Sequence, residues 1–317
     1  MKTYQFEKLD ANENVFFGKQ LESVKSKTYD IKYPEFQARK LIPVDMSAGA
    51  GAETIKYEQF DSVGFAKIVA DYAKDFPRCD IKGAEFVSII RSLGDSYGYS
   101  VQDIRAASMA GKPLQTRKAG AARRSMMQLE ENIAYYGDSS HNLGGLLTDT
   151  NVPTGTLPAD GTGALTTLVS KDPDKIIRDL NSLVNEIFTT TKGVEIPDTV
   201  LLPLEAYSHI ASTPRSSTSD TTILEFFLSK NPFVKNVGWL NQLEEPTAGW
   251  ASVGLSFTDN IALAYKRDPE KLTFEIPQDF EQFPAQPEGM DFVIPCHQRI
   301  GGVIIYYPLS MNIKEGV

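Results

Sequence analysis

The chain has 317 residues, of which 41% are hydrophobic and 23% are charged, a composition typical of globular proteins with one or two domains. Its 41 acidic residues outnumber its 32 basic residues, and the net charge of −9 argues against a protein that wraps nucleic acid tightly. Cys79 and Cys296 form no CxxC pair, and no apolar run reaches the ~20 residues of a membrane span, so neither a zinc site, a disulfide framework nor a membrane segment is expected.

Residues 1–50 carry aromatic side chains scattered among charges, without the period of a helix or a strand. Such a segment buries little apolar surface against itself, so we expect an extended arm whose aromatic residues pack on another surface. It also lacks the apolar core of a signal peptide, which predicts a chain made in a reducing cytoplasm. The stretch SAGAGAET at Ser47–Thr54 predicts a flexible joint at the end of the arm.

Two strand-like runs follow the arm, at Thr54–Tyr72 and Ala84–Ser100, with β-branched and aromatic residues near alternate positions. The four residues Asp61–Gly64 predict a turn within the first run. The segment is long and its middle is polar, so we expect two long strands joined by an excursion that cannot form a core by itself.

Helix signals begin at Ser100, a good N-cap residue with Asp103 three positions later. A second helix is predicted from Leu114 to about Tyr136, where Gly137 is a typical residue to end a helix. Three interpretations of the basic residues on this helix stay open: contact with DNA, pairing with acids of a neighbouring chain, or a solvated face. The expected apolar face is Ala119, Ala122, Met126, Leu129, Ile133 and Tyr136. The basic residues are Arg117, Lys118, Arg123 and Arg124.

The stretch GDSSHNLGGLLTDTN, from Gly137 to Asn151, holds a histidine, acids and hydroxyl groups that suggest catalysis. His141 could act as a base toward Ser139 or Ser140, with Asp138 orienting it. The alternative is a turn in which glycine ends the helix, polar side chains bind exposed backbone groups and the Gly-Gly pair bends the chain. We favour the turn, because adjacent residues rarely converge in triad geometry and the sequence has no GxSxG, GxxxxGK[ST] or HExxH motif.

Alternating helices and strands over residues 173–268 predict a compact domain of mixed helix and sheet. Cys296 and His297 suggest a thiol dyad, but neighbours in a strand point to opposite faces, so one of them is expected in the core. The acids of residues 269–289 favour a solvated surface over a metal site. Two β-rich runs flank Gly301–Gly302, which predicts a hairpin or a bulged bend.

Five phrases of the sequence carry a resemblance to a known family: ARKLIPVD, AETIKYEQFDSVGFAKI, YSVQDIRAASMAGKPLQTRKAGAARR, YYGDSSHNLGGLLTD and RIGGVIIYYPLSMNIKEGV. Together with the order of arm, excursion, long helix and mixed domain, they resemble the major capsid proteins of tailed bacteriophages. Those proteins have the Hong Kong 97-type fold, an α+β fold. The phrases are most similar to the DUF2184 type, a capsid family long catalogued as a domain of unknown function. The resemblance runs from about Ala38 onward.

The resemblance implies five parts: an N-arm at residues 1–50, an E-loop at 51–99, a P-domain at 100–172 with its spine helix at about 114–136, an A-domain at 173–268, and C-terminal strands returning to the P-domain at 269–317. It implies a structural, non-enzymatic protein of a virion. Copies of the chain would self-assemble into hexamers and pentamers of an icosahedral shell around double-stranded DNA, with no cofactor, no metal and no membrane contact.

The resemblance also implies partners and contact residues. Portal, decoration and scaffolding proteins are expected partners, the last as a separate chain because the N-arm is short. Packaged DNA would lie near the shell without being gripped. The side chains expected between subunits are Phe16, Phe17, Tyr57, Phe60, Phe65, Ile68, Arg117, Arg123 and Arg124. Two alternatives stay open: an encapsulin-type nanocompartment with the same fold, and a small soluble hydrolase that uses the Asp138–His141 turn.

Overall fold

The computed structural model describes residues 34–68, 78–111, 114–161, 167–216, 218–246 and 248–317. Residues 36–317 form one compact unit. Phe16 and Phe17 lie outside the described residues, so the expectation that they pack on a neighbour stays a prediction.

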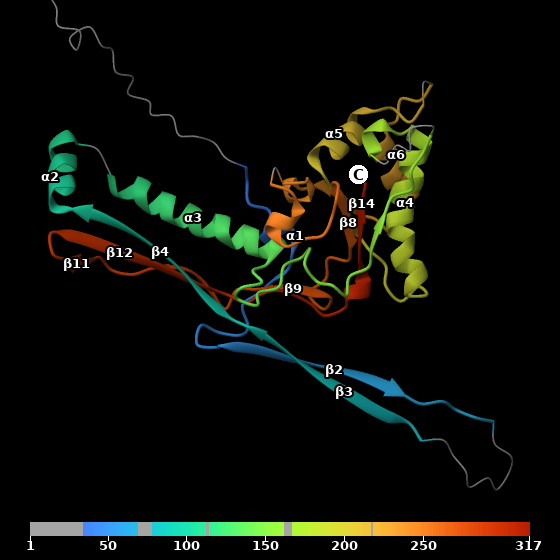
Figure 1. Cartoon of the computed structure of the whole chain (residues 1–317), viewed down its shortest axis with the longest axis horizontal. Coiled ribbons are helices and arrows are strands. Elements are labelled where there is room, and N and C mark those ends of the chain that lie inside the picture. The colour runs from blue at the N-terminus through green and yellow to red at the C-terminus, as the bar shows by residue number, and fades with distance from the viewer. Residues whose placement is uncertain (1–33, 69–77, 112–113, 162–166, 217, 247) are drawn as a thin grey trace, which may run out of the picture. The chain divides into compact units, whose positions relative to one another are not determined.

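The segment expected as an excursion forms an antiparallel hairpin, which Figure 1 shows as a two-stranded ribbon. β2 (Thr54–Val63) pairs along its whole length with β3 (Asp80–Ile89). Among the described residues, these two strands pair with each other only. The turn predicted at Asp61–Gly64 is wrong, because β2 continues to Val63. The single strand predicted at Ala84–Ser100 is instead divided at Ile90.

The second part of that run, β4, belongs to a four-stranded sheet that lies beside the long helix α3 in Figure 1. β4 pairs with β12 over ten residues, and β12 also pairs with β10 and β11. The bounds are β4 (Arg91–Ser100), β10 (Gln278–Gln282), β11 (Gln286–Glu288) and β12 (Asp291–Ile300). Along β12 burial alternates, so Cys296 is buried against Ala122 and Met126 while His297 is on the other face. The thiol dyad is therefore excluded.

The two helices predicted after β4 are confirmed. α2 (Val101–Ala110) begins with a capping box, in which Ser100 Oγ accepts from the Asp103 N–H at 3.0 Å. α3 (Leu114–Tyr136) ends before Gly137. Of the expected stripe, Ala122, Met126 and Ile133 are buried and Ala119 and Tyr136 are half-buried. Leu129 is 45% exposed instead, whereas the next two residues, both glutamates, are buried.

A five-stranded sheet of the described residues has the order β5, β14, β8, β6, β7. Three helices pack around it, and Figure 1 shows them near β8 and β14. The strands are β5 (Thr154–Thr156), β6 (Thr199–Leu202), β7 (Asn236–Trp239), β8 (Ile261–Tyr265) and β14 (Met311–Glu315). The helices are α4 (Pro173–Thr190), α5 (Leu204–Ser212) and α6 (Ile223–Lys230). The last strand therefore joins the sheet of residues 199–265, which differs from the expected return to the P-domain.

A further sheet has three strands, β1 (Val44–Asp45), β9 (Leu272–Glu275) and β13 (Gly302–Ile305). In the sequence, β9 and β13 each lie between a strand of the four-stranded sheet and a strand of the five-stranded sheet. The helix α1 (Ala38–Leu41) precedes β1. Short 3₁₀ turns occupy Leu168–Ser170, Asn241–Leu243, Trp250–Val253 and Pro308–Ser310.

Of the two alternatives predicted at Gly301–Gly302, a hairpin or a bulged bend, the hairpin does not form. The chain leaves the β4–β12 sheet at Ile300 and enters the three-stranded sheet at Gly302, so the two β-rich runs do not pair with each other. Gly302 has φ +74°, and a Cβ there would lie 2.6 Å from the Gly144 carbonyl oxygen. Glycine is required at this passage between sheets because a side chain would meet backbone.

Candidate functional site

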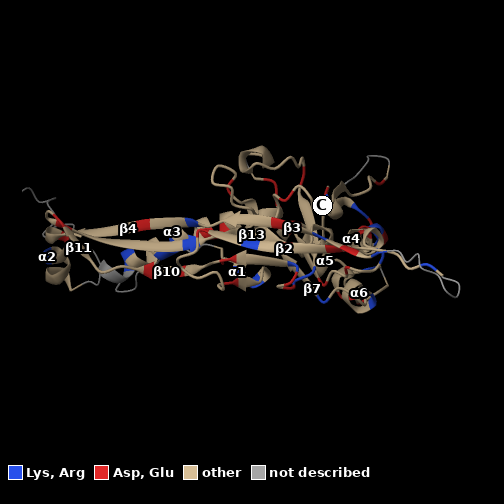
Figure 2. Cartoon of the chain, turned by 90° about the horizontal axis from the view of Figure 1, so that it is seen from below, with Lys and Arg blue, Asp and Glu red and all other residues tan. Residues whose placement is uncertain are grey.

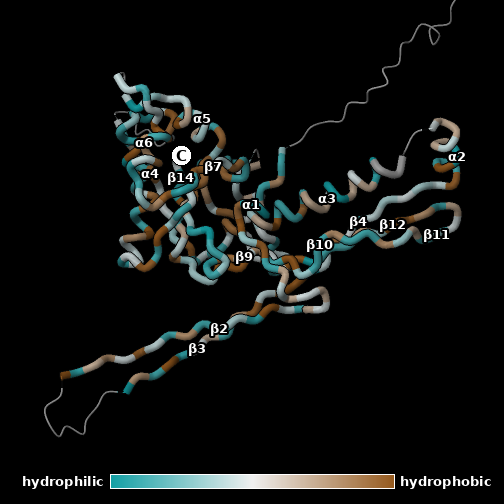
Figure 3. Tube along the Cα trace, turned by 180° about the vertical axis from the view of Figure 1, so that it is seen from behind, coloured by the Kyte–Doolittle hydropathy of each residue, from teal (hydrophilic) through white to brown (hydrophobic). Residues whose placement is uncertain are grey.

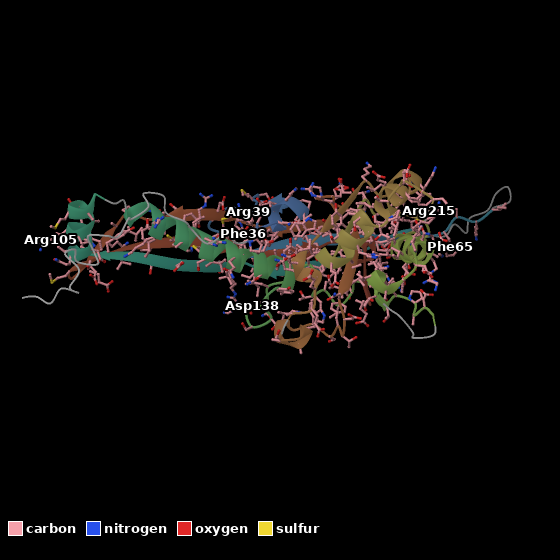
Figure 4. All side chains as sticks on the ribbon, turned by 90° about the horizontal axis from the view of Figure 1, so that it is seen from above. Phe36, Arg39, Phe65, Arg105, Asp138 and Arg215 are labelled. Carbon is pink, nitrogen blue, oxygen red and sulfur yellow. The ribbon has the colours of Figure 1, made fainter. Side chains whose placement is uncertain are left out.

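The polar side chains after α3 do come together in space. Asp138 Oδ2 lies 2.6 Å from His141 Nδ1, and Ser140 Oγ lies 2.5 Å from Asp138 Oδ1 and 3.0 Å from His141 Nδ1. Asp138, labelled in Figure 4, follows the C-terminal end of the helix. The residues that the sequence suggested for catalysis therefore do lie together, but their geometry is not that of a catalytic triad.

A nucleophilic triad needs the acid and the nucleophile on opposite nitrogens of the imidazole, so that the acid orients the ring through one nitrogen while the other nitrogen takes the proton of the nucleophile. Here both Asp138 and Ser140 contact the same nitrogen of His141. The segment is a closed turn, since Asp138 and Leu143 exchange two backbone hydrogen bonds of 2.9 Å. Gly137 has φ +64°, and a Cβ there would lie 2.5 Å from the Leu143 carbonyl oxygen. The turn interpretation is confirmed.

A groove of about 820 Å³ lies beside this turn, between the end of α3 and the 3₁₀ turn at Trp250–Val253. Its two ionisable lining residues are unsuited to acid–base chemistry at neutral pH. The hydrogen bonds from Ser140 and then His141 lower the pKa of Asp138 to about 2. Burial raises the pKa of Tyr136 to about 12. A general acid or base works best with a pKa near the operating pH, so neither group fits that task.

No metal site is found in the part of the chain that the structure describes. No group of three or more His, Cys, Asp and Glu side chains there is placed to hold an ion. Likewise, none of the described helices is long and apolar enough to cross a membrane.

The hairpin presents apolar side chains to solvent. Phe60 is 65% exposed, Phe65 is 74% exposed and Ile68 is fully exposed. Figure 3 shows hydrophobic residues at the end of this hairpin that is far from the sheets. Tyr57 differs from these three, because its ring stacks on Phe86 at 5.1 Å and meets Tyr306 edge-on at 4.9 Å. Tyr57 thus packs within its own chain at the root of the hairpin.

The basic residues of α3 are not an isolated positive face. Lys118 Nζ donates to the Gly98 carbonyl at 2.7 Å and lies 4.5 Å from the centre of the Tyr99 ring. The Arg123 guanidinium lies 5.9 Å from the centre of the Phe280 ring. Arg117 and Arg124 also take part in interactions. Figure 2 shows lysines and arginines interspersed with aspartates and glutamates along the elements.

A second exposed apolar surface, the α2 patch, was missed by the sequence analysis. α2 has no buried residue, and the turn before β12 lies beside its start, where the Val101 N–H donates to the Met290 carbonyl at 3.0 Å. The apolar members of the patch are Ile104, Met109, Met290 and Phe292, which are between 37% and 94% exposed. Arg105, labelled in Figure 4, is on the same helix. Large apolar side chains left exposed in this way are typical of a surface that contacts another molecule.

An ionic cluster around the buried Glu130, also missed, joins α1 to α3. Arg39 pairs with Glu130 of α3 at 2.5 Å and with Asp279 at 2.7 Å. Gln298 Nε2 also donates to Glu130, at 2.5 Å. The next glutamate, Glu131, accepts the backbone N–H groups at the start of α1, at 2.8 and 3.0 Å. Two acids that interrupt the apolar stripe of α3 therefore hold α1 in place.

Comparisons with solved structures show the fold. The capsid of Myoviridae phage XM1 is similar with a TM-score of 0.80 at 15% identity, covering 96% of this chain and 99% of that chain. Mycobacterium phage Ogopogo gives a TM-score of 0.60 at 14% identity, covering 94% and 97%. A virus-like particle from Pyrococcus furiosus gives 0.55 at 14% identity, covering 87% and 91%. The fold is the mixed helix-and-sheet fold of Hong Kong 97-type capsids.

Sequence comparisons add the family. A search of curated proteins finds no significant match. The model of the family described as "Major capsid protein" matches residues 64–317, which include the hairpin strand β3, α3 and all the strands that follow. Since this match covers most of the sequence, the chain belongs to the major capsid protein family.

Proposed function

We propose that this chain is the shell subunit of a tailed phage or prophage, and that its copies form hexamers and pentamers of an icosahedral shell around double-stranded DNA. The observation that carries the proposal, beside the family, is the unpartnered hairpin. Two ten-residue strands pair only with each other among the described residues, and they keep large apolar side chains in solvent. Such a ribbon is marginal alone and gains stability by lying on another subunit.

The expected contact surfaces are two, the hairpin and the α2 patch. Phe60, Phe65 and Ile68 would be covered by a neighbour in the shell. Burial of apolar surface contributes roughly 25 cal/mol per Å², so contacts of modest area add up when every subunit repeats them. Arg117, Arg123 and Arg124 are proposed to face acids of a neighbouring copy, since interspersed charges of both signs fit protein contacts better than DNA wrapping.

A shell subunit needs no catalytic centre, which agrees with the chemistry of the turn after α3. We assign no enzymatic activity and no cofactor to the chain. Packaged DNA would lie near the inner wall without tight contact. We further propose the division into N-arm, E-loop, P-domain, A-domain and C-terminal strands, except that β14 packs in the sheet of the A-domain. Separate scaffolding, portal and decoration proteins, and synthesis in a host bacterial cytoplasm, complete the proposal.

The test is to isolate the full-length chain from the bacterial cells that produce it and to measure particle size by light scattering and negative-stain microscopy. Closed particles of megadalton mass that hold nuclease-protected DNA are expected. Particles that hold a protein cargo instead would favour an encapsulin-type nanocompartment. A monomer or dimer whose hydrolase activity is lost in His141→Ala would overturn the shell proposal altogether.

A further inference from the structure

Glu275 is a buried acid at the root of the β2–β3 hairpin. It is the last residue of β9 and is 1% exposed. On one side it is in register with Asp45 of β1, and on the other with Gly302 of β13. A carboxylate in such a place must be neutralised by a cation or carry a proton, because burying an unpaired charge costs far more than burying a neutral acid.

The surroundings of Glu275 supply hydroxyl groups rather than a cation. Thr273 Oγ1 donates to Glu275 Oε1 at 2.6 Å, and Tyr306 Oη lies 3.5 Å from the same oxygen. Within the described ranges no lysine or arginine pairs with Glu275. The other charged neighbour is Asp45, whose two oxygens accept from the N–H and the hydroxyl of Ser47 at 2.8 and 2.9 Å.

Three groups act on the charge of the Glu275 carboxyl. They are Asp45 of β1, Thr273 of β9 itself and Tyr306 of the residues after β13. Burial is the main cause that raises the pKa of Glu275; the Thr273 hydrogen bond lowers it, Asp45 raises it further and Tyr306 lowers it. The net effect is a pKa above the usual value of 4.5.

Glu275 is joined to the hairpin through one glycine. The Gly301 N–H donates to the Glu275 carbonyl at 2.8 Å, and the Gly301 carbonyl accepts from Ser88 Oγ of β3 at 3.3 Å. A Cβ on Gly301 would lie 2.9 Å from Glu275 Cβ and 3.3 Å from Ile55 Cδ1 of β2. The backbone of Glu275 and both strands of the hairpin therefore lie next to the same residue, Gly301.

The aromatic rings give a second connection. The Tyr306 hydroxyl oxygen lies 2.9 Å from Thr273 Oγ1, and the Tyr306 ring meets Tyr57 of β2 edge-on. Tyr57 in turn stacks on Phe86 of β3. A change at the Glu275 carboxyl thus reaches the hairpin through a hydroxyl cluster as well as through the backbone.

We propose that the protonation of Glu275 controls the packing of the root of the β2–β3 hairpin. The root is packed while the carboxyl is protonated, and it loosens when the proton leaves. The proton leaves to water, and the resulting charge is relieved when water enters between Gly301 and Ile55. Because the folded-state pKa is raised, the stabilisation of the packed root is complete below pH 4.5 and is lost as the pH rises through the pKa of Glu275.

The test follows hydrogen–deuterium exchange of the full-length chain between pH 4 and pH 8, corrected for the intrinsic pH dependence of exchange. The reporting amides are those of Ile90, which donates to the Glu53 carbonyl at 2.9 Å, and Gly301. Opening of the root should increase about tenfold for each unit by which the folded pKa exceeds 4.5. The amide of Leu263 in β8 reports on global unfolding and should not follow this change.

Three variants decide the outcome. Glu275→Gln should keep the root closed at every pH, and Asp45→Asn should move the midpoint to lower pH because it removes a like charge. Glu58→Gln, an exposed change on the same strand as Tyr57, should behave as wild type. An unchanged pH dependence in Glu275→Gln overturns the proposal. If Glu275→Gln fails to fold, Asp45→Asn decides by itself: an unchanged midpoint of the pH dependence in that variant overturns the proposal. Light scattering on the same samples reports separately on shell formation, so the two proposals fail independently.

Discussion

Lys171 Nζ lies 2.6 Å from Asp179 Oδ2, and neither side chain is exposed to solvent. Lys171 also donates to the Pro158 carbonyl at 2.8 Å. Arg178 contacts the same aspartate at 2.6 Å and Asp160 at 2.5 Å. This network holds the segments at residues 158–161 and 171 on the first turns of α4. A buried pair of this kind is strongly destabilising to break, because the remaining charge is left without its partner.

The first prediction concerns this pair. Lys171→Met should lower the free energy of unfolding by about 3 kcal/mol, since it leaves Asp179 buried with only the half-exposed Arg178. The double variant Lys171→Met, Asp179→Leu should recover most of the loss, because it removes the buried charge as well. Denaturant unfolding of the disassembled subunit measures both. A double variant no more stable than the single one would contradict this account.

A second prediction concerns Arg39, labelled in Figure 4. Glu130→Ala should destabilise the subunit by about 3 kcal/mol, because it removes the buried acid that binds both Arg39 and Gln298. The matched control is Asp279→Asn, which removes the exposed partner of the same arginine and should cost under about 1 kcal/mol. Equal losses in the two variants would show that burial of Glu130 is not the cause.

A third prediction separates folding from assembly. The double variant Phe65→Ser, Ile68→Ser should leave the free energy of unfolding of the subunit within about 0.5 kcal/mol of wild type, because both side chains are exposed. The yield of closed particles, measured by light scattering and microscopy, should fall sharply. Glu58→Ser, at an exposed polar position of the same hairpin, should assemble normally. Normal particle yield in the double variant would refute the proposed contact.

The fourth prediction concerns the turn after α3. His141→Ala should change the free energy of unfolding at pH 7 by less than about 0.5 kcal/mol and leave particle yield unchanged, since the His141–Asp138 contact is exposed. The pKa of Asp138 is lowered, so its contribution is present above pH 3.8 and is lost as the pH falls toward 2. Unfolding measured at pH 7 and pH 2.5 should show the variant and wild type converging at the lower pH. A large loss at pH 7 would mean that the turn does more than end the helix.

Local signals in the sequence predicted several elements well. The capping box at Ser100 and the glycine at position 137 bound the helices α2 and α3 as expected. α4 buries an apolar stripe of Ile176, Leu180, Leu183, Val184 and Ile187, which lie at the three-and-four spacing of one helix face. These features depend on contacts within a few residues, or on periodicity along one helix, so a single sequence contains the information.

Other features depended on residues distant in sequence. Leu129 was expected inside and is exposed, while Glu130 beside it is buried, because Arg39 and Gln298 arrive from other elements to bind the acid. Periodicity places a side chain on a face but does not say which partner covers that face. For the same reason the hairpin, one of the two alternatives expected at Gly301–Gly302, does not form: the pattern indicated strands without indicating which sheet each would join.

The sequence by itself indicated the family, the extents of the long helices and the turn that begins at Gly137. Only the tertiary structure decided that Cys296 is the buried member of its pair, that β14 joins the sheet of β6 and β8, and that Glu275 lies under the hairpin root. The physical reason is the range of the interactions. Helix caps and apolar periods are local, whereas strand pairing and the burial of an acid depend on segments that meet only when the whole chain has folded.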